Sequence, residues 1–142
     1  MQTKGKILIV DDSALILEKA KAVLVGAGYA VVTTSQTVGV SSLLRDVDLA
    51  IIDFHMPGFD GKHVIQSIRN ATRDGKLQFL TYLYTSDDSA AQTFKTLGFD
   101  GYFSSKGDPQ ALLAQVDAAF RRLHLRALSH GFKASGSDGS RS

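Results

Sequence analysis

Short apolar runs alternate with longer segments of helical period along most of the chain. The first run, residues 6–10, is almost entirely branched aliphatic, as expected of a strand that is buried on both faces. Enrichment in valine, threonine, other aliphatic and aromatic residues predicts further strands at residues 29–34, 49–52, 77–84 and 102–103. Strands that alternate with helices in this way are typical of βα repeats around a parallel sheet.

Helices are predicted between these strands and after the last one. The expected segments are residues 13–27, residues 37–45, a helix with Val64, Ile65 and Ile68 on one face, a short helix between a cap in residues 87–89 and Gly98, and residues 109–125. At the start of the last helix, Asp108 and Pro109 are a capping residue followed by proline at the first helical position.

The whole pattern predicts an α/β fold: a flavodoxin-like (βα)5 domain with a doubly wound, five-stranded parallel sheet of strand order 2-1-3-4-5. Residues 1–128 are expected to form this domain. From Ala134 the chain is almost all Ser, Gly, Asp and Arg, so residues 129–142 are predicted to be a flexible tail.

Composition limits the class of protein. At 142 residues the chain is long enough for one buried core but not for two, and its net charge of +2 indicates neither nucleic acid nor a membrane surface as a partner. No apolar stretch approaches the roughly 20 residues of a membrane span. The absence of cysteine excludes disulfides and fits a cytoplasmic location, which we expect. The basic residues Arg121, Arg122 and Arg126 are interpreted as a solvated helix end.

Polar side chains follow four of the five predicted strands: Asp11 and Asp12, Asp53, Thr85, and Lys106. In an open parallel sheet, ligands bind beyond the carboxyl ends of the strands, where the strand order changes direction. With the first strand central and the third beside it, these residues converge at one edge. Taken singly, each has a simpler interpretation, such as a helix cap for the aspartate pair or a solvated loop position for Lys106.

Three carboxylates in one place repel one another, and their ionised forms need a cation. Three aspartates and one lysine give a formal charge of about −2, which a single Mg²⁺ neutralises with the oxygen ligands that it prefers. The chain has no cysteine, and no histidine pair lies nearby to favour zinc. Mg²⁺ and a lysine beside a carboxylate are suited to phosphoryl transfer, because both cations balance the charge of the phosphoryl oxygens while the carboxylate attacks.

This combination resembles the receiver domain of two-component response regulators over roughly residues 5–126. The matching elements, in order, are Asp11-Asp12, Asp53 followed by Met56-Pro57-Gly58 and Asp60-Gly61, Thr85, and Lys106. The spacings of 32 residues from Asp53 to Thr85 and 21 residues from Thr85 to Lys106 also resemble those of the family. One departure is Gly107, which stands where the family usually has proline, and we expect a looser loop there.

The resemblance implies a role for each residue of the pocket. Asp53 would take a phosphoryl group from the phosphohistidine of a sensor histidine kinase or a phosphotransfer protein. Asp12, Asp53 and the backbone carbonyl of His55 would bind Mg²⁺ directly, and Asp11 would hold a coordinating water. Lys106 would pair with Asp53 and then with a phosphoryl oxygen. The chain is expected to be a signalling domain that catalyses its own phosphorylation and dephosphorylation, not an enzyme.

The resemblance also implies a switch. Thr85 would move toward the phosphoryl group and Phe103 would swing inward behind it. The face made by the fourth helix, the fifth strand and the fifth helix would then change its affinity for a protein partner or a second copy of the chain. His55 and Asp87 are expected to tune the lifetime of the phosphoryl group; the alternative is that both are solvated loop residues.

Two other classes of protein were compatible with such a sheet. One is a pseudo-receiver that binds partners without using phosphate, for which the Lys106-Gly107 sequence leaves room although the pocket residues are present. The other is a metal-dependent phosphatase or nucleotide-binding enzyme. The absence of a Gly-rich phosphate-binding loop and of an Asp-x-Asp pair after the first strand argues against that enzyme class.

Overall fold

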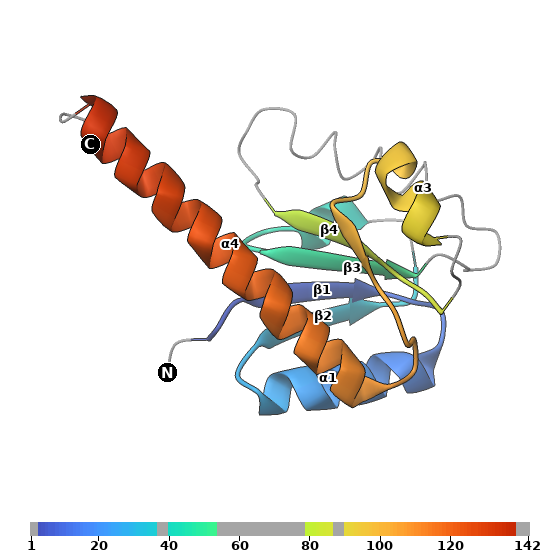
Figure 1. Ribbon diagram of the computed structural model, residues 1–142. Helices are drawn as coiled ribbons and strands as arrows, with labels where there is room; N and C mark the ends of the chain where they lie inside the picture. Colours follow the sequence, from blue (N-terminus) through green and yellow to red (C-terminus); the bar gives the residue numbers. More distant parts are fainter. Residues whose placement is uncertain (1–2, 37–39, 54–78, 87–89, 139–142) are drawn as a thin grey trace.

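The computed structural model describes residues 3–36, 40–53, 79–86 and 90–138. Within these residues the chain forms a five-stranded parallel sheet with helices packed on both faces (Figure 1). The elements in chain order are β1 (Lys6–Val10), α1 (Ala14–Gly26), β2 (Ala30–Thr34), the 3-10 helix η1 (Val40–Leu43), β3 (Leu49–Asp53), β4 (Leu80–Tyr84), α3 (Ala90–Leu97), β5 (Gly101–Phe103) and α4 (Pro109–Asp138).

The strand order is β2-β1-β3-β4-β5, with every neighbouring pair parallel, so the predicted fold and order are confirmed. The register brings the carboxyl ends of the central strands level: Val10 pairs with Ile52, and Asp53 pairs with Tyr84. Because β1 lies between β2 and β3, the order changes direction there. The residues that follow β1, β3 and β4 therefore meet at one edge.

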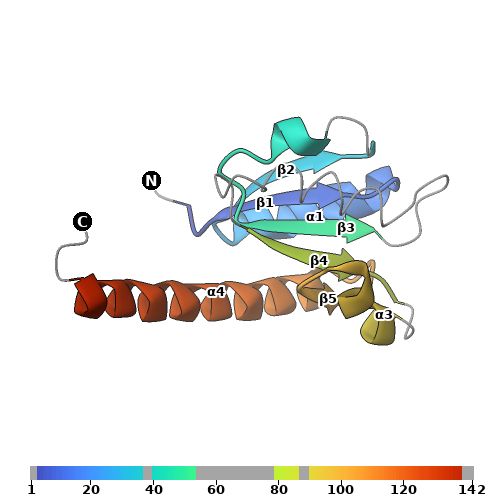
Figure 2. The same cartoon turned by 90° about the horizontal axis from the view of Figure 1, so that it is seen from above.

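Two apolar layers lie on opposite faces of the sheet, as the alternation of side chains along a strand requires. Helices α1 and α4 cover one face, whereas η1 and α3 pack on the other; Figure 2 shows the sheet between η1 and α4. The first layer includes Ile7, Ile9, Leu24, Ile51, Tyr82, Tyr84, Phe103, Leu112 and Val116, and the second includes Leu8, Val10, Leu44, Ile52, Leu83 and Phe99.

Local signals in the sequence explain where two helices begin. Ser13 is the N-cap of α1, and its hydroxyl oxygen accepts a hydrogen bond from the amide of Ile16 (3.3 Å). Asp108 caps α4 by accepting from the amides of Gln110 and Ala111, each at 3.1 Å. Pro109 then occupies the first helical position, where a missing N–H costs nothing. Both starts agree with the predicted boundaries.

The structure differs from the prediction at two helices, and two further predictions lie outside the described residues. In the segment predicted as a helix at 37–45, the described part is only the short 3-10 helix η1, because Gly39 and the β-branched residues around it disfavour an α-helix. The helix expected around Val64, Ile65 and Ile68, and the caps expected at residues 87–89, lie outside the described residues. Helix α4, predicted to end near Leu125, continues to Asp138.

The far half of α4 projects past the sheet, at the edge opposite the carboxyl ends of the strands (Figure 1 and Figure 2). Residues 126–133 contain no proline, and the single Gly131 costs about 1 kcal/mol relative to alanine, which does not stop the helix. The predicted end at Leu125 is therefore wrong, and helix reaches into the segment predicted as a tail. The division into residues 1–128 and 129–142 stays a prediction. Among the described helices, none combines the length and apolar character needed to cross a membrane.

Candidate functional site

Three aspartates gather at the carboxyl edge of the sheet. Asp11 and Asp12 follow β1, and Asp53 ends β3. One carboxylate oxygen from each lies within 4.8 Å of those of the other two. Asp11 and Asp53 are buried, whereas Asp12 is exposed, so the cluster opens to solvent on the side of Asp12. The structure thus brings together the three carboxylates that the sequence predicts as metal ligands.

Lys106 completes this cluster from the loop between β5 and α4. Its Nζ donates to Oδ1 of Asp53 at 2.5 Å and lies 3.2 Å from Oδ2 of Asp11. Burial alone would lower the pKa of Lys106, but the hydrogen bond and charge of Asp53, with those of Asp11, outweigh it and raise the pKa above its ordinary value. Lys106 is therefore a permanent cation between two buried carboxylates.

Asp11 is a buried carboxylate whose surroundings disfavour its charged form. Its Oδ1 accepts the amide of Ser13 (2.9 Å), which orients the start of α1. Its Oδ2 is buried without a hydrogen bond from any described residue. Burial raises the pKa of Asp11, the Ser13 amide opposes this, and the charge of Asp53 adds to the rise. Three clustered carboxylates with one lysine between them keep an excess of negative charge, which fits a hard divalent cation such as Mg²⁺.

The raised pKa of Asp11 predicts how stability depends on pH. The folded state holds the proton more tightly than the unfolded state, so this group's contribution to stability falls as pH rises above its ordinary pKa of 3.8. We expect Asp11→Asn, which keeps the oxygen facing Ser13, to raise the free energy of unfolding without Mg²⁺ at neutral pH by on the order of 1 kcal/mol. Urea unfolding in a chelator at about pH 7 and about pH 4.5 measures this.

The gain from Asp11→Asn is expected to shrink at the lower pH, because wild-type Asp11 is then closer to being protonated. The exposed Asp46 provides a matched control, and Asp46→Asn should change little at either pH. Unfolding curves for Asp11→Asn and wild type that keep the same separation at both pH values would contradict the argument.

Lys106 lies in a four-residue turn. The amide of Asp108 donates to the carbonyl oxygen of Ser105 at 3.0 Å, which closes the turn. Gly107, the third residue, has φ 95°, and Ser105 has φ 57°. A positive φ at the third position suits glycine, as in a type II turn. Proline, with φ fixed at about −65° and no N–H, does not fit there. The departure from the family at this position is thus part of the turn itself.

Phe103 lies on the face of the sheet opposite that of Thr85, and its expected part in a switch stays a prediction. Phe103 pairs with Tyr84, is 2% exposed, and stacks on Tyr82 in the layer beneath α4. Thr85, one residue after Tyr84, belongs to the opposite face by strand alternation. The β5 residue on the face of Thr85 is Tyr102, which pairs with Leu83 and is 39% exposed. Tyr102 was not among the residues predicted from the sequence.

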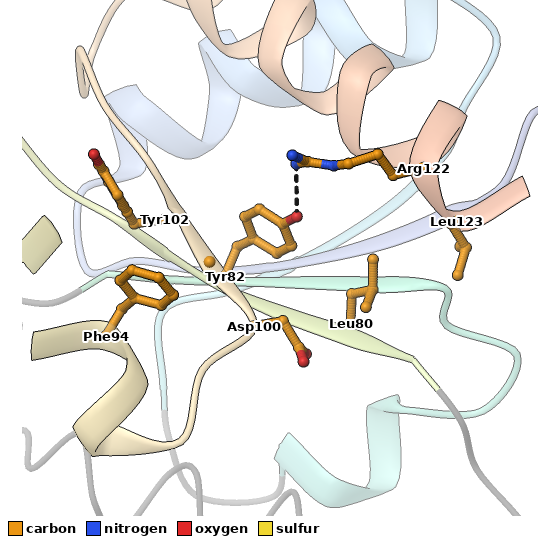
Figure 3. Close-up of a pocket in the computed structure, with 8 residues that line it drawn as sticks. Leu80, Tyr82, Phe94, Asp100, Tyr102, Arg122 and Leu123 are labelled. Carbon is orange, nitrogen blue, oxygen red and sulfur yellow. Dashed lines mark hydrogen bonds between the residues drawn. The ribbon is translucent and has the colours of Figure 1, made fainter. Parts of the chain in front are cut away.

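Tyr102 borders a hollow of about 430 Å³ over the edge strand β5 (Figure 3). Its ring lies 5.5 Å from that of Phe94 in α3, and Arg122 of α4 donates to the hydroxyl of Tyr82 at 2.9 Å across the hollow. Gly101 also lines the hollow, and a Cβ at this position would lie 2.7 Å from the Tyr82 ring, so glycine allows the backbone to approach that ring closely. The elements that line it are α3, β4, β5 and α4 and the residues before β5.

The structure describes only some of the remaining residues that were predicted to belong to the site. Thr85 is buried directly after β4, and its amide donates to the carbonyl oxygen of Phe103 at 3.1 Å. His55 and Asp87 lie outside the described residues, so their expected influence on the phosphoryl lifetime stays a prediction. The N-cap of α1 is Ser13 and neither aspartate of the pair.

A doubly wound sheet of this order, with an acidic pocket and a paired lysine at its carboxyl edge, defines an α/β domain whose site fits a phosphoacceptor. The family described as "Response regulator receiver domain" matches residues 7–117. The chain therefore belongs to the receiver domains of two-component response regulators, which are signalling domains.

Individual proteins to which this chain is similar also include response regulators. The "Probable transcriptional regulator ycf27" of Guillardia theta is 33% identical over 138 residues, covering 96% of this chain and 53% of that protein. "Response regulator SaeR" of Staphylococcus aureus (strain USA300) is 27% identical over 118 residues, covering 82% of this chain and 51% of that protein. This chain thus spans about half the length of these relatives. The chemotaxis response regulator CheY4 of Vibrio cholerae shares the fold, with a TM-score of 0.68 at 23% identity over 83% of this chain and 98% of that one.

Proposed function

We propose that the chain is a phosphorylation-dependent switch in which Asp53 takes a phosphoryl group from the phosphohistidine of a sensor histidine kinase or a phosphotransfer protein. The observation that carries this proposal is the setting of Asp53. Its carboxylate pairs with Lys106 at 2.5 Å and shares a cluster of oxygen atoms, all within 4.8 Å, with Asp11 and Asp12. A carboxylate nucleophile, a fixed cation and a metal-binding oxygen set are the parts that phosphoryl transfer needs.

In the proposed transfer, a carboxylate oxygen of Asp53 forms a bond to phosphorus. The bond from phosphorus to the histidine nitrogen breaks, and that nitrogen leaves with the electron pair. Lys106, kept charged by its raised pKa, balances the negative phosphoryl oxygens. Mg²⁺ would be held by Asp12, Asp53 and the backbone carbonyl of His55, with Asp11 holding a coordinating water, and would supply further positive charge at the same place. Attack of water on phosphorus would later break the bond from phosphorus to the Asp53 oxygen, release inorganic phosphate and regenerate the carboxylate.

We propose that the switch passes through Thr85 and Tyr102, with Tyr102 taking the part that the sequence assigned to Phe103. Their shared face of the sheet supports this. The output surface would be the face of α3, β5 and α4 around the hollow, binding a protein partner or a second copy of the chain. Because the net charge is only +2, we propose that residues 1–128 contact neither nucleic acid nor membrane directly. We also propose that the chain acts in the cytoplasm, which the absence of cysteine fits.

Beryllium fluoride, which mimics a phosphoryl group on a carboxylate, tests the proposal. We expect the amide resonances of Thr85 and Tyr102 to shift when beryllium fluoride and Mg²⁺ are both present, and to return when a chelator removes the metal. Asp53→Asn, which lacks the acceptor oxygen, should show no such shift. A wild-type spectrum that stays unchanged at saturating concentrations of both would instead favour the pseudo-receiver, a module that binds partners without phosphate.

A further inference from the structure

Two hydroxyl groups at the end of β4 hold the turn that carries Lys106. The amide of Lys106 donates to Oγ of Ser86 at 3.0 Å, and the amide of Gly107 donates to the hydroxyl oxygen of Tyr84 at 3.1 Å. The turn is therefore bonded to the neighbouring strand through two successive N–H groups. The second of these bonds requires that residue 107 has an N–H, which glycine supplies and proline lacks.

Tyr84 is the more rigid of the two anchors. Its side chain is 1% exposed and belongs to the apolar layer beneath α1 and α4, whereas Ser86 is exposed. A ring fixed by packing on several sides keeps its hydroxyl at one place. Burial raises the pKa of Tyr84, and the Gly107 hydrogen bond opposes that rise, so the hydroxyl stays neutral at physiological pH and available as an acceptor.

We propose that Tyr84 is a positioning residue: by holding the amide of Gly107, it sets the place from which Lys106 reaches Asp53. The two residues that Tyr84 connects explain the effect. Tyr84 pairs in register with Asp53 across β3 and β4, while Gly107 is the direct neighbour of Lys106. One side chain thus relates the acceptor carboxylate to the backbone that carries its cation. This inference rests on the proposed phosphoryl transfer and adds a residue that the sequence motif does not contain.

The chain offers a matched control in Tyr29. Tyr29 is also buried, at 4% exposure, and its hydroxyl donates to Asp117 of α4. It precedes β2, at the edge of the sheet opposite the acidic cluster. Tyr29→Phe and Tyr84→Phe therefore each remove one hydroxyl group from a buried ring, but only Tyr84→Phe releases the turn of Lys106.

Phosphorylation by acetyl phosphate with Mg²⁺ measures the effect. We expect Tyr84→Phe to slow uptake by about 3- to 10-fold, the change that corresponds to one hydrogen bond. Tyr29→Phe should leave the rate unchanged. In a Lys106→Ala background, Tyr84→Phe should have no further effect, because it acts through that lysine. An equal slowing with and without Lys106, or by Tyr29→Phe, would show a general structural role and overturn the proposal.

A second measurement does not depend on a phosphodonor. In spectra of the free protein, Tyr84→Phe should shift the amide resonance of Gly107 and the side-chain ammonium resonance of Lys106, whereas Tyr29→Phe should shift neither. If the wild type takes up no phosphoryl group but these shifts occur, the proposed function fails and the positioning of Lys106 stands. If Lys106 does not shift, the positioning role is refuted regardless of phosphorylation.

Discussion

Asp53→Asn is expected to abolish uptake of a phosphoryl group by this chain. The change keeps the size of the side chain but replaces a carboxylate oxygen with an amide nitrogen that does not attack phosphorus. Incubation with acetyl phosphate and Mg²⁺, followed by intact mass, should show one added phosphoryl group on wild type and none on the variant. The bond on wild type should be cleaved by hydroxylamine, as an acyl phosphate is.

Asp46→Asn is the control for this experiment. Asp46 is exposed in the turn before β3 and has φ 62°, an angle that asparagine tolerates, so the control preserves the local backbone. It should be phosphorylated like wild type. A stable phosphoryl group on Asp53→Asn that resists hydroxylamine would place the acceptor on another side chain.

Lys106→Met should produce the largest loss of stability among changes at the site. It leaves Asp11 and Asp53, each 1% exposed, without their shared cation. Breaking a buried ion pair costs about 3–5 kcal/mol, and we expect the lower end because Lys106 itself is 17% exposed. Urea unfolding at neutral pH in a chelator measures the loss, with Lys21→Met on the exposed side of α1 as the control.

Repeating the unfolding measurement in Mg²⁺ separates the contribution of the Lys106 charge from that of its side-chain packing. A cation that binds only the folded state stabilises it by about 2.7 kcal/mol at 100 times its dissociation constant. We expect Lys106→Met to recover much of its loss in Mg²⁺, because the metal neutralises the same carboxylates. A loss that persists at saturating Mg²⁺ would mean that the packing of the lysine side chain, not its charge, stabilises the pocket.

The sheet and its acidic edge were predictable from short stretches of sequence. A run such as Ile51-Ile52-Asp53 predicts both a buried strand and a polar residue at its end, and Asp108-Pro109 predicts the start of the last helix. These features are local. Once the alternation of strands and helices indicated a parallel sheet, the convergence of Asp11, Asp12 and Asp53 followed from topology alone.

Phe103 was given its role by counting back three residues from Lys106, whereas the structure places it on the face of the sheet opposite that of Thr85. The connection instead passes through Ser104 and Ser105, and Ser105 takes a left-handed angle that shifts the count by one. In a strand, a shift of one residue exchanges the two faces. The two polar serines do not continue the apolar pattern of β5, and this change of pattern could have indicated that the strand ends at Phe103.

Two other features, the bond between Gly107 and Tyr84 and the end of α4, could not be predicted from short stretches of sequence. The bond from Gly107 to Tyr84 joins residues 23 positions apart, and nothing near Tyr84 in sequence indicates that its hydroxyl faces a loop. The end of α4 was placed from composition, which described the serines and glycines after Ala134 but not the ability of the preceding residues to continue a helix.

Helix α4 is long, and its first turn lies next to the acidic pocket. The helix begins three residues after Lys106 and runs for 30 residues, about 45 Å at 1.5 Å per residue. A tilt of about 5° around its first turn would displace its far end by about 4 Å. A small rearrangement of the Lys106 turn that tilts α4 would therefore produce a larger displacement at the far end of the helix.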